Sequence, residues 1–231
     1  NNMNRIAIRN NKFCIVPPSG EIVSSDSTFI DVVIINKTKV PSRMYYSEGK
    51  HQCWSTSGVK PDIEVNNQQN KTCLGCSKNI SGSGEGMSRA CRFQKQLAIL
   101  LANNIMEGEI YQLIITSISI FGKASGNKMP FDAYSKYMKA HKVDLEHVVT
   151  EIRLDEDNEL PKLLFFPKRP LDVHEYQLCQ EKSKEKKSID ATKIHFISHK
   201  DNFSEEDLIL NNSGNFSYLM QAMGMTADIK R

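Results

Sequence analysis

The order of hydrophobic and polar positions predicts a chain rich in β-strands. Residues 29–38, FIDVVIINKT, are almost continuously apolar and rich in β-branched side chains, which is typical of a buried strand. Shorter strands are expected at 12–16 and, after the turn near Pro41, at 42–48. The remainder of residues 1–28 is polar, with a break at Pro17-Pro18, and is expected to be a loosely structured N-terminal lead-in.

Two further pairs of apolar runs predict hairpins. QLAILLA and IYQLIITSISI flank the turn NNIMEGE, and VVTEIRL and KLLFFPKR flank the acidic turn DEDNELP. The run RFQKQLAILL would also fit a helix, but a strand is the preferred interpretation. Between the hairpins, PFDAYSKYMKAH begins with a proline and has apolar residues at Phe131, Tyr134 and Met138, which predicts a short amphipathic helix.

The same pattern divides the chain into a strand-rich domain and two appendages. We expect the main domain at 29–178, interrupted by an insert at about 50–92 that is poor in regular structure. A loop of about 40 residues is uncommon inside a compact domain, so something other than apolar packing must order it. From residue 179 the stretch QEKSKEKKS reads as a charged linker, and 179–231 as a tail with one short helix at NFSYLMQAMGM.

Four of the six cysteines lie in this polar insert and suggest a metal site. Cys73 and Cys76 form a C-x2-C pair, with Cys53 before it and Cys91 after it. Four thiolates complete the tetrahedron that structural zinc prefers, and His51 is a possible substitute ligand. Four thiolates also allow an iron–sulfur cluster. Separate buried cysteines would not explain the clustering, whereas Cys14 and Cys179 are expected to be lone structural residues.

The glycine-rich stretch SGSGEGMSR lies between Cys76 and Cys91. It lacks the G-x4-G-K-[ST] spacing of a phosphate-binding P-loop, and no strand runs into it. The preferred use of its glycines is therefore a tight chain reversal before Cys91.

The charge of the chain is unevenly distributed. The net charge is only +3, but residues 37–95 hold ten Lys and Arg against four Asp and Glu, whereas residues 96–178 hold nine against twelve. A basic segment of this kind indicates a surface for an anionic partner, although lysine-rich loops are often simply solvated.

Basic and aromatic residues are interleaved around the cysteines, as in proteins that bind single-stranded nucleic acid. The candidate binding residues are Arg89, Arg92, Lys95, Lys71, Lys78, Tyr45, Tyr46 and Trp54. Phe93 and Tyr111 are better explained as core residues. The six histidines and the acidic turn form no recognisable catalytic constellation, so an enzyme is not expected.

No apolar run approaches the roughly 20 residues of a membrane span. The N-terminal residues NNMNRIAIRN have no apolar segment of the kind found in a signal peptide. The expected location is therefore a reducing compartment, in which clustered cysteines are more often metal ligands than disulfides.

The segment from about Cys53 to Phe166 resembles a widespread group of tailed-phage proteins. The resemblance rests on a C-x2-C-x-x-N, Gly-Ser-Gly, Arg-Ala-Cys-Arg pattern, here CLGCSKN followed by GSGEGMSRACR. The order of elements is also similar to that of the zinc-containing single-stranded-DNA-binding proteins of large phages. In those proteins a zinc knuckle interrupts an OB-fold barrel, often with one His and three Cys as ligands, whereas a fourth Cys is present here.

This resemblance implies a mainly β chain with minor α content and an OB-fold-like barrel interrupted by a zinc-binding insert. It implies a non-enzymatic protein of phage type that binds single-stranded DNA in the cytoplasm of a bacterial host cell, in DNA replication or recombination. Replication or recombination proteins are possible partners through the C-terminal tail, where SEEDLIL is acidic and apolar. The alternatives are a zinc-stabilised protein-interaction or transcription-regulating module, and a nuclease carrying a zinc or iron–sulfur element.

Overall fold

The computed structural model describes residues 3–18 and 22–195. The chain divides into two compact units, each considered by itself. Among the described residues, the first comprises 3–18, 22–39 and 94–194, and the second comprises 40–93 and His195. From His195 onward only His195 is described, so the predicted helix at 215–225 and the SEEDLIL segment lie outside the described residues.

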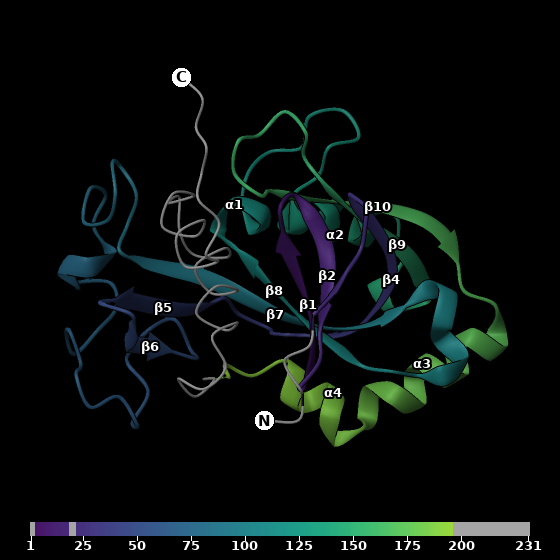
Figure 1. Cartoon of the computed structure of the whole chain (residues 1–231), viewed down its shortest axis with the longest axis horizontal. Helices are drawn as coiled ribbons and strands as arrows, with labels where there is room; N and C mark the ends of the chain where they lie inside the picture. The colour runs from purple at the N-terminus through teal and green to yellow at the C-terminus, as the bar shows by residue number, and fades with distance from the viewer. Residues whose placement is uncertain (1–2, 19–21, 196–231) are drawn as a thin grey trace. The chain divides into compact units, whose positions relative to one another are not determined.

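The first unit is built on one strongly curled sheet with the strand order β10-β9-β4-β7-β8-β1-β2-β3 (Figure 1). The pairing of β1 with β8 is parallel, and the other pairs along this path are antiparallel. The strands are β1 Asn4–Arg9, β2 Lys12–Val16, β3 Val23–Ser24, β4 Phe29–Lys37, β7 Cys91–Leu101, β8 Tyr111–Thr116, β9 Val148–Leu154 and β10 Leu163–Pro170. Strand β7 begins in the second unit and continues into the first.

Two apolar clusters cover opposite faces of this sheet. Val32 and Ile34 of β4 belong to a cluster with helix α2 Phe131–Ala140, while Val33 and Ile35 belong to a second cluster that includes Cys179 and Ala191. Because successive side chains of a strand point to opposite faces, β4 needs apolar residues at consecutive positions where both faces are covered, as at Val32–Ile35. This explains the nearly continuous apolar run within 29–38. The same alternation in β7 makes RFQKQLAILL a strand rather than a helix.

Most of the regular elements expected from the sequence are present. The strands at 12–16, 29–38 and 42–48 are confirmed as β2, β4 and β5 Ser42–Ser47, and both hairpins are confirmed as β7–β8 and β9–β10. The predicted amphipathic helix is α2, with Phe131, Tyr134 and Met138 on its buried side. The mainly β composition with minor helix is therefore confirmed.

The expectation of a loosely structured lead-in over residues 1–28 is wrong for the described part. Strand β1 pairs with both β8 and β2, and Ile6, Ile8 and Phe13 are buried in the first cluster. The alternating isoleucines of NRIAIR carried this signal, but the flanking asparagines and arginines obscured it. The predicted strand IYQLIITSISI is also shorter than expected, because its last residues form the short helix α1 Ser117–Ile120.

The expected charged linker after residue 179 is also wrong in its described part. Residues there form helix α3 Val173–Lys184, which begins at a capping box of Asp172 and Glu175, and helix α4 Lys186–Ala191. Only a few residues, among them Cys179 and Ala191, anchor these helices. A helix held by so few apolar side chains looks like a solvated linker in sequence. The remaining elements are β6 Lys50–Ser55 and the 3₁₀ turns η1 Ser77–Asn79, η2 Ala102–Glu107 and η3 Leu145–His147.

Among the described residues, no helix is long and apolar enough to span a bilayer.

A chain that ends at residue 178 should unfold more easily than a chain that ends at residue 195. The shorter chain loses Cys179 and Ala191 from the second cluster, and buried Gln112 loses its bonds to the carbonyl oxygens of Ala191, 2.8 Å away, and Lys193, 3.1 Å away. An unsatisfied buried amide alone costs about 1–3 kcal/mol. Urea denaturation of both chains measures the difference, and equal midpoints would show that the helices are dispensable.

Candidate metal centre

The second unit is organised by the hairpin of β5 and β6. The two strands pair antiparallel with Tyr45 opposite Cys53, and the turn uses Glu48 and Gly49 in the left-handed region, with φ of 54° and 70°. That geometry is typical of a two-residue hairpin turn, where glycine carries a positive φ without a steric cost. Met44, only 1% exposed, anchors the hairpin. The hairpin therefore places Cys53 on a fixed strand.

The segment from 56 to 90 is held by backbone bonds rather than by an apolar core. The Cys73 amide donates to the carbonyl of Val59 over 2.8 Å, and the Asn79 amide donates to the carbonyl of Cys76 over 2.9 Å. Val65, at 5% exposed, is its only fully aliphatic side chain among the buried residues described. The expected insert at about 50–92 is poor in regular structure from 56 to 90, as predicted. Its first residues, Lys50–Ser55, form strand β6 instead.

The four predicted metal ligands lie around one small cavity. Cys53, Cys73, Cys76 and Cys91 all line a cavity of about 20 Å³. A space of that size holds about one water-sized particle. Cys73 and Cys76 are 8% and 7% exposed, and Cys53 and Cys91 are half-buried. His51, the possible substitute, is not among the described residues that line this cavity.

The four thiols line one cavity but do not form a ligating arrangement in this structure. No three His, Cys, Asp or Glu side chains in the described ranges are placed so that they could bind a single ion together. A metal here requires the four sulfurs to converge further on the cavity. The donor set itself is soft, and four thiolates suit zinc or iron rather than magnesium or calcium.

Without a metal, burial raises the pKa values of Cys53 and Cys91 and keeps these two thiols protonated. Burial raises the pKa of Cys91 to about 12, the positive charge of Arg43 opposes this rise, and the other three thiols add to it. Burial also raises the pKa of Cys53, against a hydrogen bond from the backbone of Gln69. Metal binding at this cavity would therefore displace protons from the thiols.

Arg43 is a buried cation at the same cavity. Its side chain is 9% exposed, and it donates from Nε to the carbonyl of Gly58 over 2.9 Å and from a terminal nitrogen to Asn79 Oδ1 over 2.7 Å. The guanidinium carbon lies 3.9 Å from the centre of the Phe93 ring. No carboxylate among the described residues pairs with Arg43. Leaving a buried charge without its counter-charge costs roughly 3–5 kcal/mol, so a negative charge at the thiols fits this site.

Asn79 joins the cysteine knuckle to two arginines. Its Oδ1 accepts from Arg43 and also from Arg89 over 3.0 Å, and its Nδ2 donates to the carbonyl of Cys73 over 2.9 Å. Sequence reasoning assigned no role to Arg43 or Asn79. The only signal for Asn79 was its place in the C-x2-C-x-x-N pattern, and Arg43 gave none because an arginine on a strand is usually exposed.

The glycine loop is a tight chain reversal, as expected. The amides of Gly82 and Gly84 both donate to the carbonyl of Ser88 over 3.0 Å, and a Cβ on Gly84 would lie 2.7 Å from the Ser88 hydroxyl. Arg92 closes the loop, donating to the Arg89 carbonyl over 3.2 Å and to Ser88 Oγ over 3.1 Å. Burial lowers the pKa of Arg92, and nearby Glu85 opposes this. Arg92 thus has a structural role in the loop.

Three of the predicted nucleic-acid contacts adjoin the cysteine cavity. Tyr45, Trp54 and Lys78 line it together with the thiols, and the Lys78 amine lies 5.1 Å from the centre of the Tyr45 ring. Tyr46 is half-buried against the edge of His51, with ring centres 5.2 Å apart. Lys71 and Arg89 are exposed.

Lys95 lies elsewhere. It belongs to the first unit, is 8% exposed, and its amine is 3.5 Å from Asp132 and 5.1 Å from the centre of the Phe131 ring. A buried amine with a carboxylate partner has little charge left for a phosphate. This geometry argues against Lys95 as a phosphate contact.

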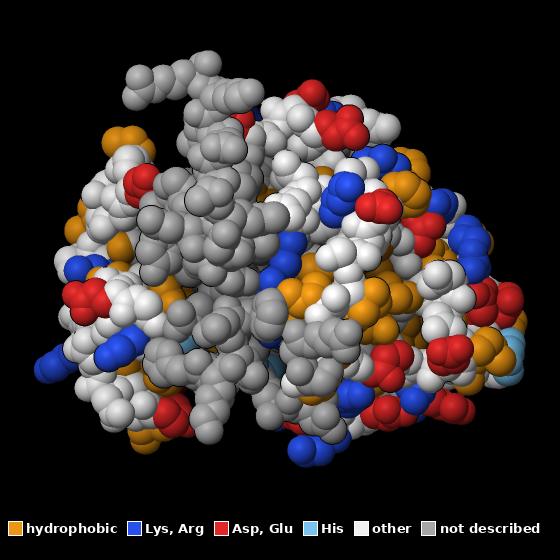
Figure 2. Space-filling view, in the orientation of Figure 1, with side chains coloured by type: hydrophobic (Ala, Val, Ile, Leu, Met, Phe, Trp, Pro, Cys, Tyr) orange, Lys and Arg blue, Asp and Glu red, His pale blue; other side chains and the backbone are white. Residues whose placement is uncertain are grey.

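Burial also reduces the local basic excess. Residues 40–93 hold seven Lys and Arg against four Asp and Glu, and among the seven Arg43 is buried and Arg92 is half-buried. On the face shown in Figure 2, the described Lys and Arg side chains are interspersed with Asp and Glu rather than forming one basic stripe.

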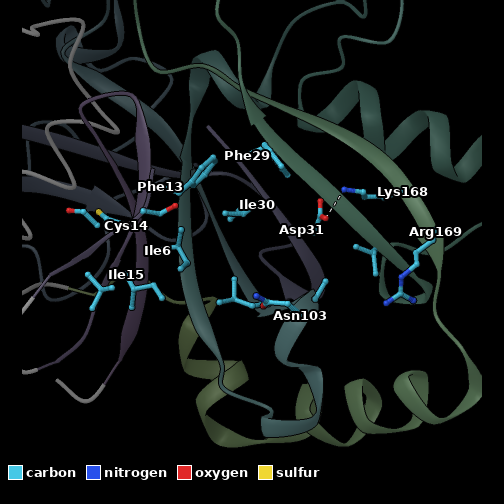
Figure 3. A pocket seen from close by; sticks show the side chains of 16 residues that line it. Ile6, Phe13, Cys14, Ile15, Phe29, Ile30, Asp31, Asn103, Lys168 and Arg169 are labelled. Carbon is cyan, nitrogen blue, oxygen red and sulfur yellow. Dashed lines mark hydrogen bonds and ion pairs between the residues drawn. The ribbon is translucent and has the colours of Figure 1, made fainter. Parts of the chain in front are cut away.

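A larger cavity lies in the first unit, with a volume of about 530 Å³ (Figure 3). Its lining is mainly apolar, including Ile6, Ile15 and Ile30, and the Lys168 amine is held 2.7 Å from Asp31 Oδ2. Arg169 is paired with both carboxylate oxygens of Glu175. With its cations already neutralised, this cavity does not have the features of a phosphate-binding groove.

Comparison with protein-family models, curated proteins and solved structures gives no match to this chain.

Asn79→Ala should destabilise the second unit by about 1–3 kcal/mol for each buried group left without a partner. The change removes the shared acceptor of Arg43 and Arg89 and the donor to the Cys73 carbonyl. The matched control is Asn67→Ala, because Asn67 is exposed and its side chain donates to Gln52 Oε1, while the bond from Gln69 reaches its backbone carbonyl and is kept. Thermal unfolding followed by the fluorescence of Trp54, the single tryptophan, measures both variants. Equal midpoints for the two variants would contradict the role given to Asn79.

Proposed function

We propose that this chain is a non-enzymatic single-stranded-DNA-binding protein whose second unit is stabilised by a structural zinc ion. Cys53, Cys73, Cys76 and Cys91 would hold the ion, and zinc would supply folding free energy to a segment that has almost no apolar core. The residues of the chain would do the binding, with aromatic side chains stacking on bases and basic side chains contacting phosphates.

One observation carries this proposal. The cavity lined by four thiols is also lined by Tyr45, Trp54 and Lys78, so candidate metal ligands and candidate nucleic-acid contacts share one small structure. A metal at the thiols would fix these side chains, which lowers the ordering entropy lost when a strand binds. Exposed Lys71 and Arg89 would add phosphate contacts, and Arg92 and Lys95 are left out because of the contacts described above.

The curled sheet of the first unit supports an OB-like interpretation only in part. An OB fold is a five-stranded, partly open barrel. The path here has eight strands and stays open between β10 and β3. We propose that the chain elaborates such a barrel, as the resemblance to phage DNA-binding proteins implies, and that it serves DNA replication or recombination in a phage-infected cell.

A second candidate function is a zinc-stabilised module for protein interaction or for transcription regulation. Its support is the exposure of apolar side chains on the second unit, where Ile63, Leu74 and Met87 are 92%, 88% and 82% exposed. Single exposed apolar residues are common on protein surfaces, so this observation ranks below the shared cavity.

The purified chain should contain about one zinc ion, and a chelator should lower its melting temperature. Cys76→Ser should lose the ion, because three thiolates leave the tetrahedral site open. Cys14→Ser is the control, since Cys14 lies in the first unit with Sγ 3.5 Å from the carbonyl of Ala7. Elemental analysis and thermal denaturation test this. A brown protein would indicate iron–sulfur instead, and a metal-free chain of unchanged stability would exclude any structural metal.

Single-stranded oligonucleotides should quench Trp54 fluorescence more strongly than duplex DNA at the same salt concentration. Lys71→Gln should weaken binding and flatten the salt dependence by roughly 0.7 in slope for the lost phosphate contact. Tyr45→Ala should weaken binding by about 1–3 kcal/mol with little change in slope. The control is Lys136→Gln, an exposed lysine on α2.

Two results would count against this function. Absence of single-stranded-DNA binding even at low salt would leave the interaction module as the better proposal. Binding that is unchanged in both Lys71→Gln and Tyr45→Ala would keep the function but remove the site from the second unit.

A further inference from the structure

Arg43 is an unusual arginine because all its partners in the described structure are neutral. It donates to a backbone carbonyl at Gly58 and to the amide oxygen of Asn79, and its guanidinium stacks on Phe93. At 9% exposed, its charge is largely removed from water. Neutral acceptors satisfy the hydrogen bonds of a guanidinium but do not neutralise its charge, and an unneutralised charge is expensive to bury.

The position of Arg43 identifies where the missing negative charge would be. Arg43 lines the same small cavity as the four cysteines. Four thiolates around one divalent ion leave an excess negative charge of about two, whereas four protonated thiols leave none. A metal–thiolate centre would therefore give Arg43 an anionic neighbour, and Arg43 would offset about half of the negative charge of that centre.

We infer that Arg43 is the counter-cation of an anionic metal–tetrathiolate centre, an inference that rests on the metal site proposed above. Its hydrogen bonds and the Phe93 ring fix the guanidinium, so that the positive charge is present in the right place before the metal arrives. Arg43 is thus a positioning and charge-balancing residue outside the ligand set. Residues of this kind typically change metal affinity by about 10–100-fold when they are replaced.

The inference predicts that the charge of Arg43, and not only its shape, determines metal affinity. Arg43→Gln removes the charge and should weaken zinc binding by about 10–100-fold. Arg43→Lys keeps the charge but loses the fork of donors, and should recover most of the affinity. Arg89→Gln is the matched control, because Arg89 donates to the same Asn79 oxygen but is exposed to solvent.

The experiment uses the full chain. Zinc affinity is measured by competition with a chromophoric chelator, and the thiolate environment is read from the sulfur-to-metal charge-transfer band of the Co²⁺-substituted protein. Loss of a nearby positive charge raises the energy of the sulfur lone pairs, so Arg43→Gln should shift this band to longer wavelength. Arg43→Lys and Arg89→Gln should leave the band close to its wild-type position. A merely structural role for Arg43 would lower stability without moving the band.

The outcomes separate this inference from the proposed function. If the wild-type chain binds neither zinc nor Co²⁺, the metal centre itself is absent. If the wild type binds metal and Arg43→Gln keeps both its affinity and its band position, the metal centre stands and the role of Arg43 is wrong. If Arg43→Gln does not fold, Arg43→Lys decides: near wild-type affinity supports the inference, and a loss of 10-fold or more contradicts it.

Discussion

The second unit depends on one constraint: the segment between β6 and β7 must be ordered with almost no apolar side chains to bury. Backbone bonds around the cysteine knuckle and the three hydrogen bonds of Asn79 connect it, but each such bond contributes only about 0.5–1.5 kcal/mol net. Fixing the backbone costs about 1–2 kcal/mol for each residue. The four thiols line one cavity, and a metal bound by them would add the large free energy that the hydrogen bonds lack.

The same constraint explains why several basic residues of this unit have structural roles rather than contacts with solvent. Arg43 lies against the thiols, Arg92 closes the glycine loop, and Lys78 lies over an aromatic ring. In a unit without an apolar core, the long side chains of arginine and lysine supply both packing surface and donors. Some of the basic side chains that the sequence suggested for a binding surface therefore stabilise the unit instead. Only the exposed members, such as Lys71 and Arg89, are available for phosphates.

Sequence periodicity predicted the fold where strands are buried on both faces and failed where they are not uniformly apolar. FIDVVIINKT has an unmistakable pattern because both faces of β4 are covered, while NRIAIR buries its isoleucines between polar neighbours and was missed. Helices α3 and α4 were missed because few side chains anchor them. At the candidate site, cysteine spacing was enough to predict which thiols share a cavity. The burial of Arg43 and Lys95 could not be predicted, since the same residue types on a strand are exposed in most proteins.

The first unit contributes a scaffold whose features differ from those of the second. Its larger cavity is apolar and its cations Lys168 and Arg169 are paired with carboxylates, so charge there is balanced without any ligand. At the cysteine cavity the reverse holds: a buried guanidinium has only neutral partners, and four thiols carry no charge until they lose their protons. A buried charge without a described counter-charge is a physical reason to look for function in the second unit before the first.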